Sequence, residues 1–130
     1  MKFRDEFAFL SNFFSCNVAG FSSNEHFFQA MKTIVLEERE LIRKASTPGK
    51  AKRLGRKVTL RADWNEIRLR VMEWGLRRKF SDPVLMGKLK NIEGEIVEDN
   101  DWHDTFWGVC NGEGRNELGK LLMSIRDEPS

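Results

Sequence analysis

Three polar side chains with complementary chemistry lie close together in the stretch Ser22–Leu36. An acid, Glu25, is followed by an amide, Gln29, at i+4 and by an amine, Lys32, at i+7. On a helix these side chains lie nearly in line over about 10 Å. A positioned carboxyl group can move a proton and a lysine can form a covalent intermediate. The spacing therefore predicts the floor of a site for a small polar ligand.

A helix over Ser23–Leu36 is expected to carry this line. At 100° per residue, an arc of about 160° is apolar, made of Ala30, Ile34, Phe27, Met31, Val35 and Phe28. The opposite side holds Lys32, Glu25, Leu36, Gln29, Thr33 and His26. A polar side is also typical of a face in contact with solvent. Ser22 with Glu25 further matches a helix capping box. Both ordinary interpretations stand beside that of a ligand site.

A second group of interest is cationic and surrounds Gly55. It consists of Arg53, Arg56, Lys57 and Arg61, and it leads directly into Trp64. Cations beside an exposed aromatic ring suit a phosphate and a stacked base. The alternative is an ordinary basic surface, with Trp64 as the first core residue of its helix.

A third group is the run DWHDTFWG, Asp101–Gly108. Desolvation against aromatic surface raises the pKa of a carboxyl group and suits it to acid–base chemistry. An acidic loop is the alternative, and it accounts for Asp101 better than for Asp104. The glycines of GEGRNELG, Gly112–Gly119, precede a helix, where backbone amides and the helix dipole can favour an anion. This run matches neither a P-loop nor a dinucleotide fingerprint.

The composition is that of a globular protein of 130 residues, predicted to form a single domain over 1–130. A net charge of +2 permits an anionic partner, although dedicated nucleic-acid domains are usually more basic. The sequence has neither an apolar run long enough for a membrane span nor a secretion leader. Cys16 and Cys110 lack C-x-x-C spacing, so free thiols in a cytoplasmic location are expected. The scattered histidines and cysteines predict no metal site.

The expected fold class is α+β, a small helix-rich domain with a few short strands. Further helices are predicted over Glu37–Ala45, 49–57 after the Thr47-Pro48 start, Asp63–Phe80, Pro83–Lys90 and Glu117–Arg126. Short strands or extended segments are predicted over Phe3–Phe14, Val18–Phe21, Glu95–Glu98 and Phe106–Val109.

Together the groups supply carboxylates, a lysine, aromatic rings, cations and a glycine-rich helix start, without a serine or cysteine nucleophile in a known frame. This set suits hydrolysis of a glycosidic bond in a nucleotide-like molecule. There a carboxylate stabilises an oxocarbenium-like transition state or guides water, and another group helps the base to leave.

Five blocks occur in a characteristic order from Phe9 to Arg126: FLSNFF, SNEHFFQAMK, TPGKAKRLGRKVTLRADW, DTFWG and GEGRNELGKLLMSIR. This succession resembles the NADAR (YbiA-like) family. The resemblance implies a small α+β domain with N-glycosidase activity and no cofactor. It also implies one of two substrate groups: ribosylamine intermediates of the riboflavin pathway, or ADP-ribose attached to guanine in DNA.

Carried onto this chain, the resemblance makes Glu25, Lys32 and Asp104 the catalytic residues, with Asp101 as the alternative late acid. Trp64 matches the family's essential tryptophan. The expected substrate-binding residues are Ser11, Asn12, Phe13, His26, Gln29, Gly55, Arg56, Arg61, Trp64, Trp107, Gly108, Gly114, Asn116 and Gly119.

Two mechanisms follow from these assignments. In one, Glu25 acts as a general base or stabilises the oxocarbenium ion while Asp104 assists. In the other, Lys32 forms a Schiff base with the ring-opened sugar. ADP-ribosyl-guanine in DNA is the preferred substrate, with the riboflavin intermediate as the alternative. A non-catalytic ADP-ribose reader is the alternative from another class, and a reader has no need of both the acids and the lysine.

Overall fold

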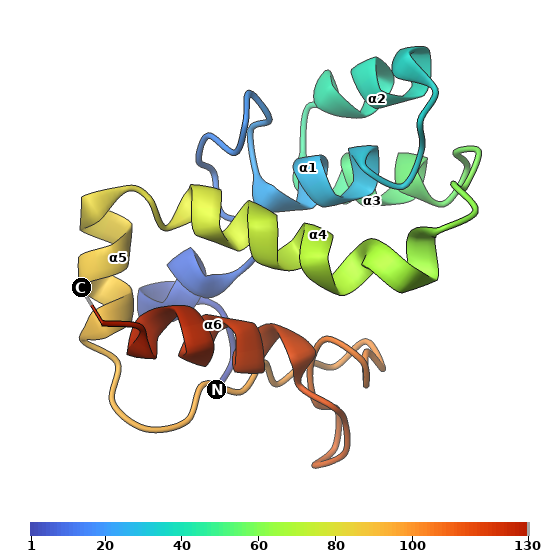
Figure 1. Ribbon diagram of the computed structural model, residues 1–130. Coiled ribbons are helices and arrows are strands. Elements are labelled where there is room, and N and C mark those ends of the chain that lie inside the picture. The colour runs from blue at the N-terminus through green and yellow to red at the C-terminus, as the bar shows by residue number, and fades with distance from the viewer. Residues whose placement is uncertain (130) are drawn as a thin grey trace. The chain divides into compact units, whose positions relative to one another are not determined.

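The computed structural model describes residues 1–129 and is built mainly of helices (Figure 1). They are the 3-10 helix η1 (Asp5–Leu10) and the α-helices α1 (Asn24–Ala30), α2 (Leu36–Arg43), α3 (Pro48–Gly55), α4 (Trp64–Lys79), α5 (Pro83–Lys90) and α6 (Glu117–Asp127). The chain divides into two compact units. Residues 12–79 form the α1–α4 unit, whereas residues 1–11 and the chain from Phe80 onward form the α5–α6 unit. The single domain over 1–130 stays a prediction.

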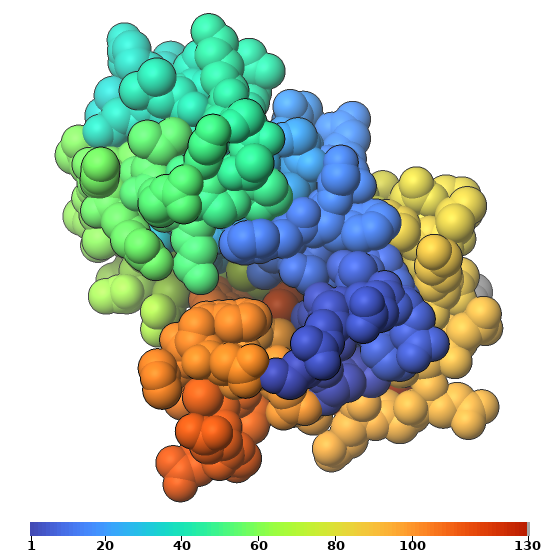
Figure 2. Space-filling view, turned by 180° about the vertical axis from the view of Figure 1, so that it is seen from behind, coloured from blue at the N-terminus to red at the C-terminus, as the bar shows by residue number. Residues whose placement is uncertain are grey.

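Helix α1 is the centre of the α1–α4 unit. It contacts α2, α3 and α4 (Figure 1), and α2 and α3 lie side by side on the face that Figure 2 shows. Every residue of α1 is buried. A small core of Ala30, Ile42 and Ala51 joins α1 to α2 and α3. Small alanine side chains allow such close helix packing, because nothing beyond Cβ keeps the backbones apart.

The prediction of one helix over Ser23–Leu36 is wrong at its C-terminal end, since α1 stops at Ala30. The chain after Ala30 is held by other hydrogen bonds: the Lys32 carbonyl accepts from the Arg61 amide at 2.8 Å, and the Thr33 carbonyl accepts from Arg39 at 2.7 Å. Ile34 therefore leaves the expected apolar face and is 68% exposed. Hydrophobic periodicity cannot register these long-range bonds.

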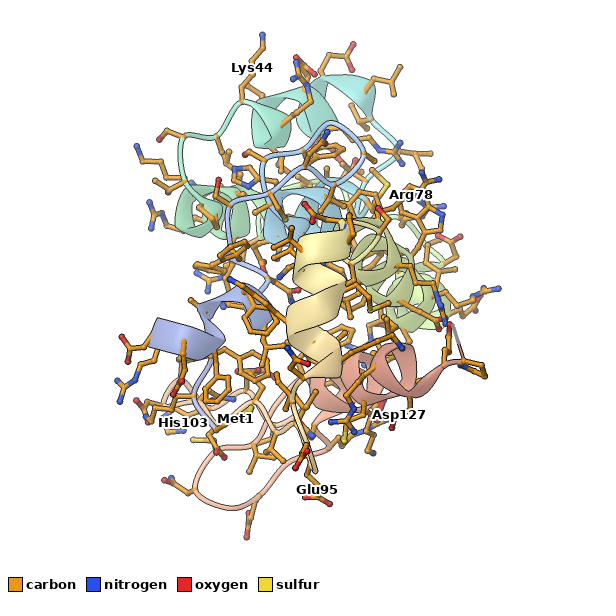
Figure 3. All side chains as sticks on the ribbon, turned by 90° about the vertical axis from the view of Figure 1, so that its left-hand side faces the viewer. Met1, Lys44, Arg78, Glu95, His103 and Asp127 are labelled. Carbon is orange, nitrogen blue, oxygen red and sulfur yellow. The ribbon has the colours of Figure 1, made fainter. Side chains whose placement is uncertain are left out.

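The other predicted helices are confirmed, with ends shifted by a few residues. The Thr47 side chain accepts a hydrogen bond from the Lys50 amide and so caps α3, with Pro48 in the first turn. Asp82 caps α5 by accepting from the amides of Val84 and Leu85. On α4, Trp74 stacks on Phe27 at 5.1 Å between ring centroids, and the guanidinium of Arg78, labelled in Figure 3, lies 4.3 Å from the Trp74 ring.

The predicted strands are wrong within residues 1–129, where isolated bridges alone pair Val18 with Phe21, Asp99 with Val109, and Cys110 with Glu113. The segment Phe3–Phe14 contains η1, from which Phe9 and Leu10 enter the core. A cluster of phenylalanines can be buried from a helical turn as well as from a strand, so composition did not decide between them. The helix-rich part of the prediction is confirmed, and the β part is supported only loosely.

The α5–α6 unit is closed by a buried asparagine. Asn116 lies just before α6 with φ of 54°, and its amide group donates to the Ile96 carbonyl at 2.9 Å and accepts from the Glu98 amide at 3.0 Å. The N-terminal ammonium of Met1, labelled in Figure 3, donates to the Val97 carbonyl at 3.0 Å. Neither Cys16 nor Cys110 forms a disulfide bond within residues 1–129. No helix within residues 1–129 is both long and apolar enough to cross a bilayer.

Candidate active site

Glu25 is a buried carboxyl group that capping does not explain. The N-cap of α1 is Ser23, whose side chain accepts from the His26 amide at 3.1 Å. The predicted capping box of Ser22 and Glu25 is therefore wrong by one residue. The solvated-face interpretation is also wrong, because Glu25 is only 8% exposed. A buried acid without a capping role is typical of a functional position.

The Glu25 carboxyl group has one hydrogen-bond donor among the described residues. Gln29 Nε2 donates to Glu25 Oε2 at 2.6 Å. Burial raises the pKa of Glu25 because it disfavours the charged form. The hydrogen bond from Gln29 and the charges of Lys52, Lys32 and His26 act in the opposite direction. Burial is the largest of these influences, so the pKa of Glu25 is raised overall, as suits a carboxyl group that holds and releases a proton during a reaction.

Lys32 is one of two lysines whose charges act on Glu25, the other being Lys52. Burial is the largest cause that lowers its pKa, and the charges of Arg56 and Lys52 lower it further, whereas Glu25 raises it. Its ammonium group makes neither a hydrogen bond nor an ion pair with any residue from 1 to 129. A lowered pKa favours the neutral amine, and the neutral form is the one that attacks a carbonyl carbon.

Lys52 is a site residue that sequence reasoning missed. Its charge lowers the pKa values of both Glu25 and Lys32. It lies on α3 three residues before Gly55, and i, i+3 positions share a helix face. The spacing between Lys52 and Gly55 is the sequence signal that places this amine on the same helix face as the glycine.

Asn12 positions the start of α1. Its carbonyl accepts from the Glu25 amide at 2.9 Å, and its side-chain oxygen accepts from Asn24 Nδ2 at 2.9 Å. The first amides of a helix have no intrahelical partner, so Asn12 fixes the helix turn that carries Glu25. Phe13 beside it is 44% exposed, while Ser11 belongs to the α5–α6 unit. Their roles in substrate binding stay predictions.

Hydrogen bonds of the His26 and Arg61 side chains connect the two ends of α1 to other parts of the α1–α4 unit. His26 is 1% exposed, and its ring nitrogens contact Ser23 Oγ at 2.7 Å and the Ala45 carbonyl at 2.9 Å. Arg61 Nε donates to Asp63 Oδ1 at 2.7 Å, and its NH1 donates to the Met31 carbonyl at 3.4 Å. Both side chains are engaged by protein groups, so contact with substrate stays a prediction for each. Arg56, by contrast, is exposed beside Lys32.

Trp64 is a core residue of the α1–α4 unit. It is 6% exposed and packs edge-on against Phe28 of α1, with 5.0 Å between ring centroids. We expect Trp64→Ala to lower the free energy of unfolding by about 3–5 kcal/mol, because it leaves a cavity beside α1. Trp64→Phe keeps a ring against Phe28 and should cost less. Urea unfolding of both variants measures the packing effect, and ADP-ribose affinity of Trp64→Phe measures any contact with ligand.

Asp104 and Asp101, the two candidates for the late acid, have different surroundings in the α5–α6 unit. Asp104 Oδ1 accepts from the amides of Phe106 and Trp107 at 3.1 and 2.9 Å. Asp101 is exposed and bound by Lys2 Nζ at 2.8 Å, which holds the pKa of Asp101 below its usual range. A half-buried, positioned carboxylate is the better candidate, so the structure favours Asp104. Its catalytic role stays a prediction.

The glycine-rich run before α6 does not leave its amides open to an anion. The amides of Asn116, Glu117 and Leu118 donate to the carbonyls of Gly108, Phe106 and Trp107 at 3.3, 3.1 and 2.9 Å. These three amides, which were expected to bind an anion, are therefore already hydrogen-bonded to backbone carbonyls.

Three glycines of this region allow close packing. An added Cβ would lie 2.4 Å from the Glu98 carbonyl at Gly108, 2.2 Å from the Gly108 carbonyl at Gly114, and 2.2 Å from the Ile96 carbonyl at Gly119. A part in substrate binding stays a prediction for these glycines, for Asn116 and for Trp107. Among residues 1–129, no group of three or more His, Cys, Asp or Glu side chains is arranged to hold a metal ion.

Comparison with known proteins connects this site to a family. Residues 2–128 match the family described as NADAR domain. The chain is 37% identical to N-glycosidase YbiA of Shigella boydii, over 82% of this chain and 69% of that protein. It is also 37% identical to a riboflavin biosynthesis protein of Vibrio vulnificus, over 92% of this chain but only 35% of that protein.

The fold agrees with these relatives. The NMR structure of E. coli YbiA matches with a TM-score of 0.86 and 34% identity, covering 98% of this chain and 80% of that chain. The resemblance stated from the sequence is thus confirmed, and so is the expectation that it leads to N-glycosidases, hydrolases that act on N-glycosidic bonds. The chain belongs to the NADAR family.

Proposed function

We propose that this chain is an N-glycosidase that hydrolyses the bond between a ribose and a nucleobase or related heterocycle. The observation that carries the proposal is the buried carboxyl group of Glu25 within electrostatic reach of the Lys32 amine. Burial moves both groups toward their neutral forms, and their mutual attraction opposes this shift. Shifts in these directions suit an acid and an amine that take part in proton transfer with a substrate.

Two routes use this pair. In the direct route, ionised Glu25 activates water or stabilises the oxocarbenium-like transition state, and water adds to the anomeric carbon. In the imine route, the sugar ring opens, and the Lys32 nitrogen forms a bond to C1 while the bond from C1 to the base nitrogen breaks. The departing base takes a proton that Glu25 can supply, and water then hydrolyses the lysine imine to release the sugar.

ADP-ribosyl-guanine in DNA remains our preferred substrate. Five exposed or half-exposed cations on α3 and just after it make no ion pair with the described residues. They are Lys50, Lys52, Arg53, Arg56 and Lys57. Lys52 and Arg56 act electrostatically on the Glu25–Lys32 pair. Cations without carboxylate partners suit the diphosphate of ADP-ribose and a neighbouring phosphate backbone. The name of the Vibrio vulnificus relative favours a ribosylated riboflavin intermediate as the second candidate.

Two substrates presented to the same enzyme test the proposal. One is a DNA oligonucleotide carrying ADP-ribosyl-guanine, and the other is a ribosylamino-pyrimidine phosphate. We expect release of free ADP-ribose from the first. Arg53→Glu should raise KM for the oligonucleotide and flatten its salt dependence, whereas Arg70→Glu, an exposed control on α4, should not. Turnover of the pyrimidine alone would identify the second candidate, and binding of ADP-ribose without turnover of either substrate would identify a reader.

A further inference from the structure

Gln29 is a buried polar side chain that directly contacts Glu25. It lies one turn after Glu25 on α1 and is 4% exposed. Its Nε2 donates to Glu25 Oε2 at 2.6 Å. Glu25 Oε1 accepts no hydrogen bond from residues 1–129, so the amide engages one carboxylate oxygen and leaves the other for chemistry.

The amide of Gln29 is in turn held by the backbone of α3. A Cβ added to Gly55 would lie 1.9 Å from Gln29 Oε1 and 2.7 Å from its Cδ. Any side chain at position 55 would therefore displace the amide. The sequence predicted that Gln29 and Gly55 bind substrate, and this stays a prediction for both. In the structure Gln29 contacts Glu25 on one side and Gly55 on the other.

Burial of the Gln29 amide lowers the stability of the fold relative to an apolar side chain at the same position. Gln29 Oε1 is buried and has no hydrogen-bond partner in the described chain. An unpartnered buried carbonyl is unfavourable, and an apolar side chain of similar length would not incur this penalty. The amide is thus retained despite its cost to the fold, which points to what it does for Glu25.

We propose that Gln29, clamped against Gly55, is a positioning residue that fixes the orientation and protonation of the Glu25 carboxyl group. This inference rests on the proposed function, in which Glu25 acts at the anomeric carbon. The N–H of Gln29 stabilises the ionised carboxylate, against the effect of burial. Its loss should raise the pKa of Glu25 further. Whether Glu25 acts as a base or as an acid, the limb of the pH–rate profile that reports it should move to higher pH.

Other charged groups also act on Glu25, and they remain in place when Gln29 is replaced. They are Lys52 from α3, Lys32 beyond the end of α1, and His26 on α1 itself. Within residues 1–129, α2 and α4 contribute no charged group that shifts the pKa of Glu25. A change in the titration of Glu25 in a Gln29 variant can therefore be assigned to the lost hydrogen bond.

Gln29→Met is the first test, because methionine keeps length and removes the amide. The carboxyl carbon of Glu25 is followed by NMR during a pH titration, and kcat and KM are measured over the same range. We expect unchanged or higher thermal stability, an unchanged KM, and a titration and kcat limb moved upward by about half to one pH unit. If neither the titration of the Glu25 carboxyl group nor the limb of the kcat pH profile shifts, the proposal is overturned. A raised KM with unchanged kcat would overturn it in favour of substrate binding.

Gly55→Ala tests the clamp from the other side. It should reproduce the upward shift, because it displaces the amide without touching Glu25. Gly49→Ala is the matched control on α3, since its added Cβ meets nothing closer than Thr47 Oγ1 at 3.9 Å. If Gly55→Ala does not fold, the pair Gly55→Ala with Gln29→Ala decides: restored folding supports the clamp, and continued failure overturns it. The NMR titration does not require enzymatic activity, so it tests the clamp separately from the proposed function. If the parent protein is inactive on both substrates but the variants still shift the titration of Glu25, the proposed function is refuted and the clamp is supported.

Discussion

Glu25→Gln is expected to reduce kcat by orders of magnitude while the protein keeps its fold and its affinity for ligand. Glutamine is nearly isosteric, and its side-chain oxygen can still accept from Gln29 Nε2, which lies 2.6 Å from Glu25 Oε2. It can neither take up a proton nor stabilise a developing positive charge at the anomeric carbon. Single-turnover assays of base release measure the loss, and titration with ADP-ribose measures the retained affinity.

The same variant should be more stable than the parent at neutral pH. Because burial raises the pKa of Glu25 above its ordinary value of 4.5, folding favours the protonated acid. The stability that this preference supplies is complete below pH 4.5 and is lost as pH rises through the folded-state pKa. Glutamine is insensitive to pH, so the difference in thermal midpoint should grow with pH across this window and disappear in acid.

Glu66→Gln is the matched control, since Glu66 is exposed in the first turn of α4. It should leave kcat and the pH dependence of stability unchanged. Near-normal turnover of Glu25→Gln would mean that the buried carboxyl group has no part in the reaction, and the proposed function would lose its main support.

Lys32→Arg should abolish turnover if the imine route operates. A guanidinium group keeps the positive charge but stays protonated and cannot form an imine with C1 of the sugar. Sodium borohydride added during turnover reduces a lysine imine to a secondary amine, which leaves the sugar covalently attached. Mass spectrometry should then locate one adduct on Lys32 in the parent enzyme and find it absent from Lys32→Arg.

Lys57→Arg controls for the loss of a lysine at the exposed end of the same basic region. It should keep both the activity and the adduct on Lys32. An active Lys32→Arg without any adduct in the parent would exclude the imine route. Lys32 would then act only as a charge near Glu25, and water activated by Glu25 would be the nucleophile.

The helices themselves could largely be predicted from the sequence, because their signals are local. Thr47-Pro48 and Asp82-Pro83 mark two helix starts by chemistry that acts within one turn. The pairing of the acid and the amide at i and i+4 could also be recognised without a structure, since one turn of α1 fixes their relative positions. The expected position of Lys32 in line with them on the same helix is wrong, because α1 ends at Ala30.

The tertiary structure decided what those residues do. Hydrophobic periodicity assigned the polar side of α1 to solvent, yet contacts with α2, α3 and α4 bury it, and burial is what raises the pKa of Glu25. Lys52 acts on Glu25 and Gly55 packs against Gln29, although each pair is more than twenty residues apart in the sequence. Likewise, α1 ends at Ala30, and the Lys32 carbonyl beyond it accepts from the distant Arg61 amide. Local patterns specify which helices form, whereas desolvation and long-range contacts, which arise only when helices pack, determine the chemistry of the site.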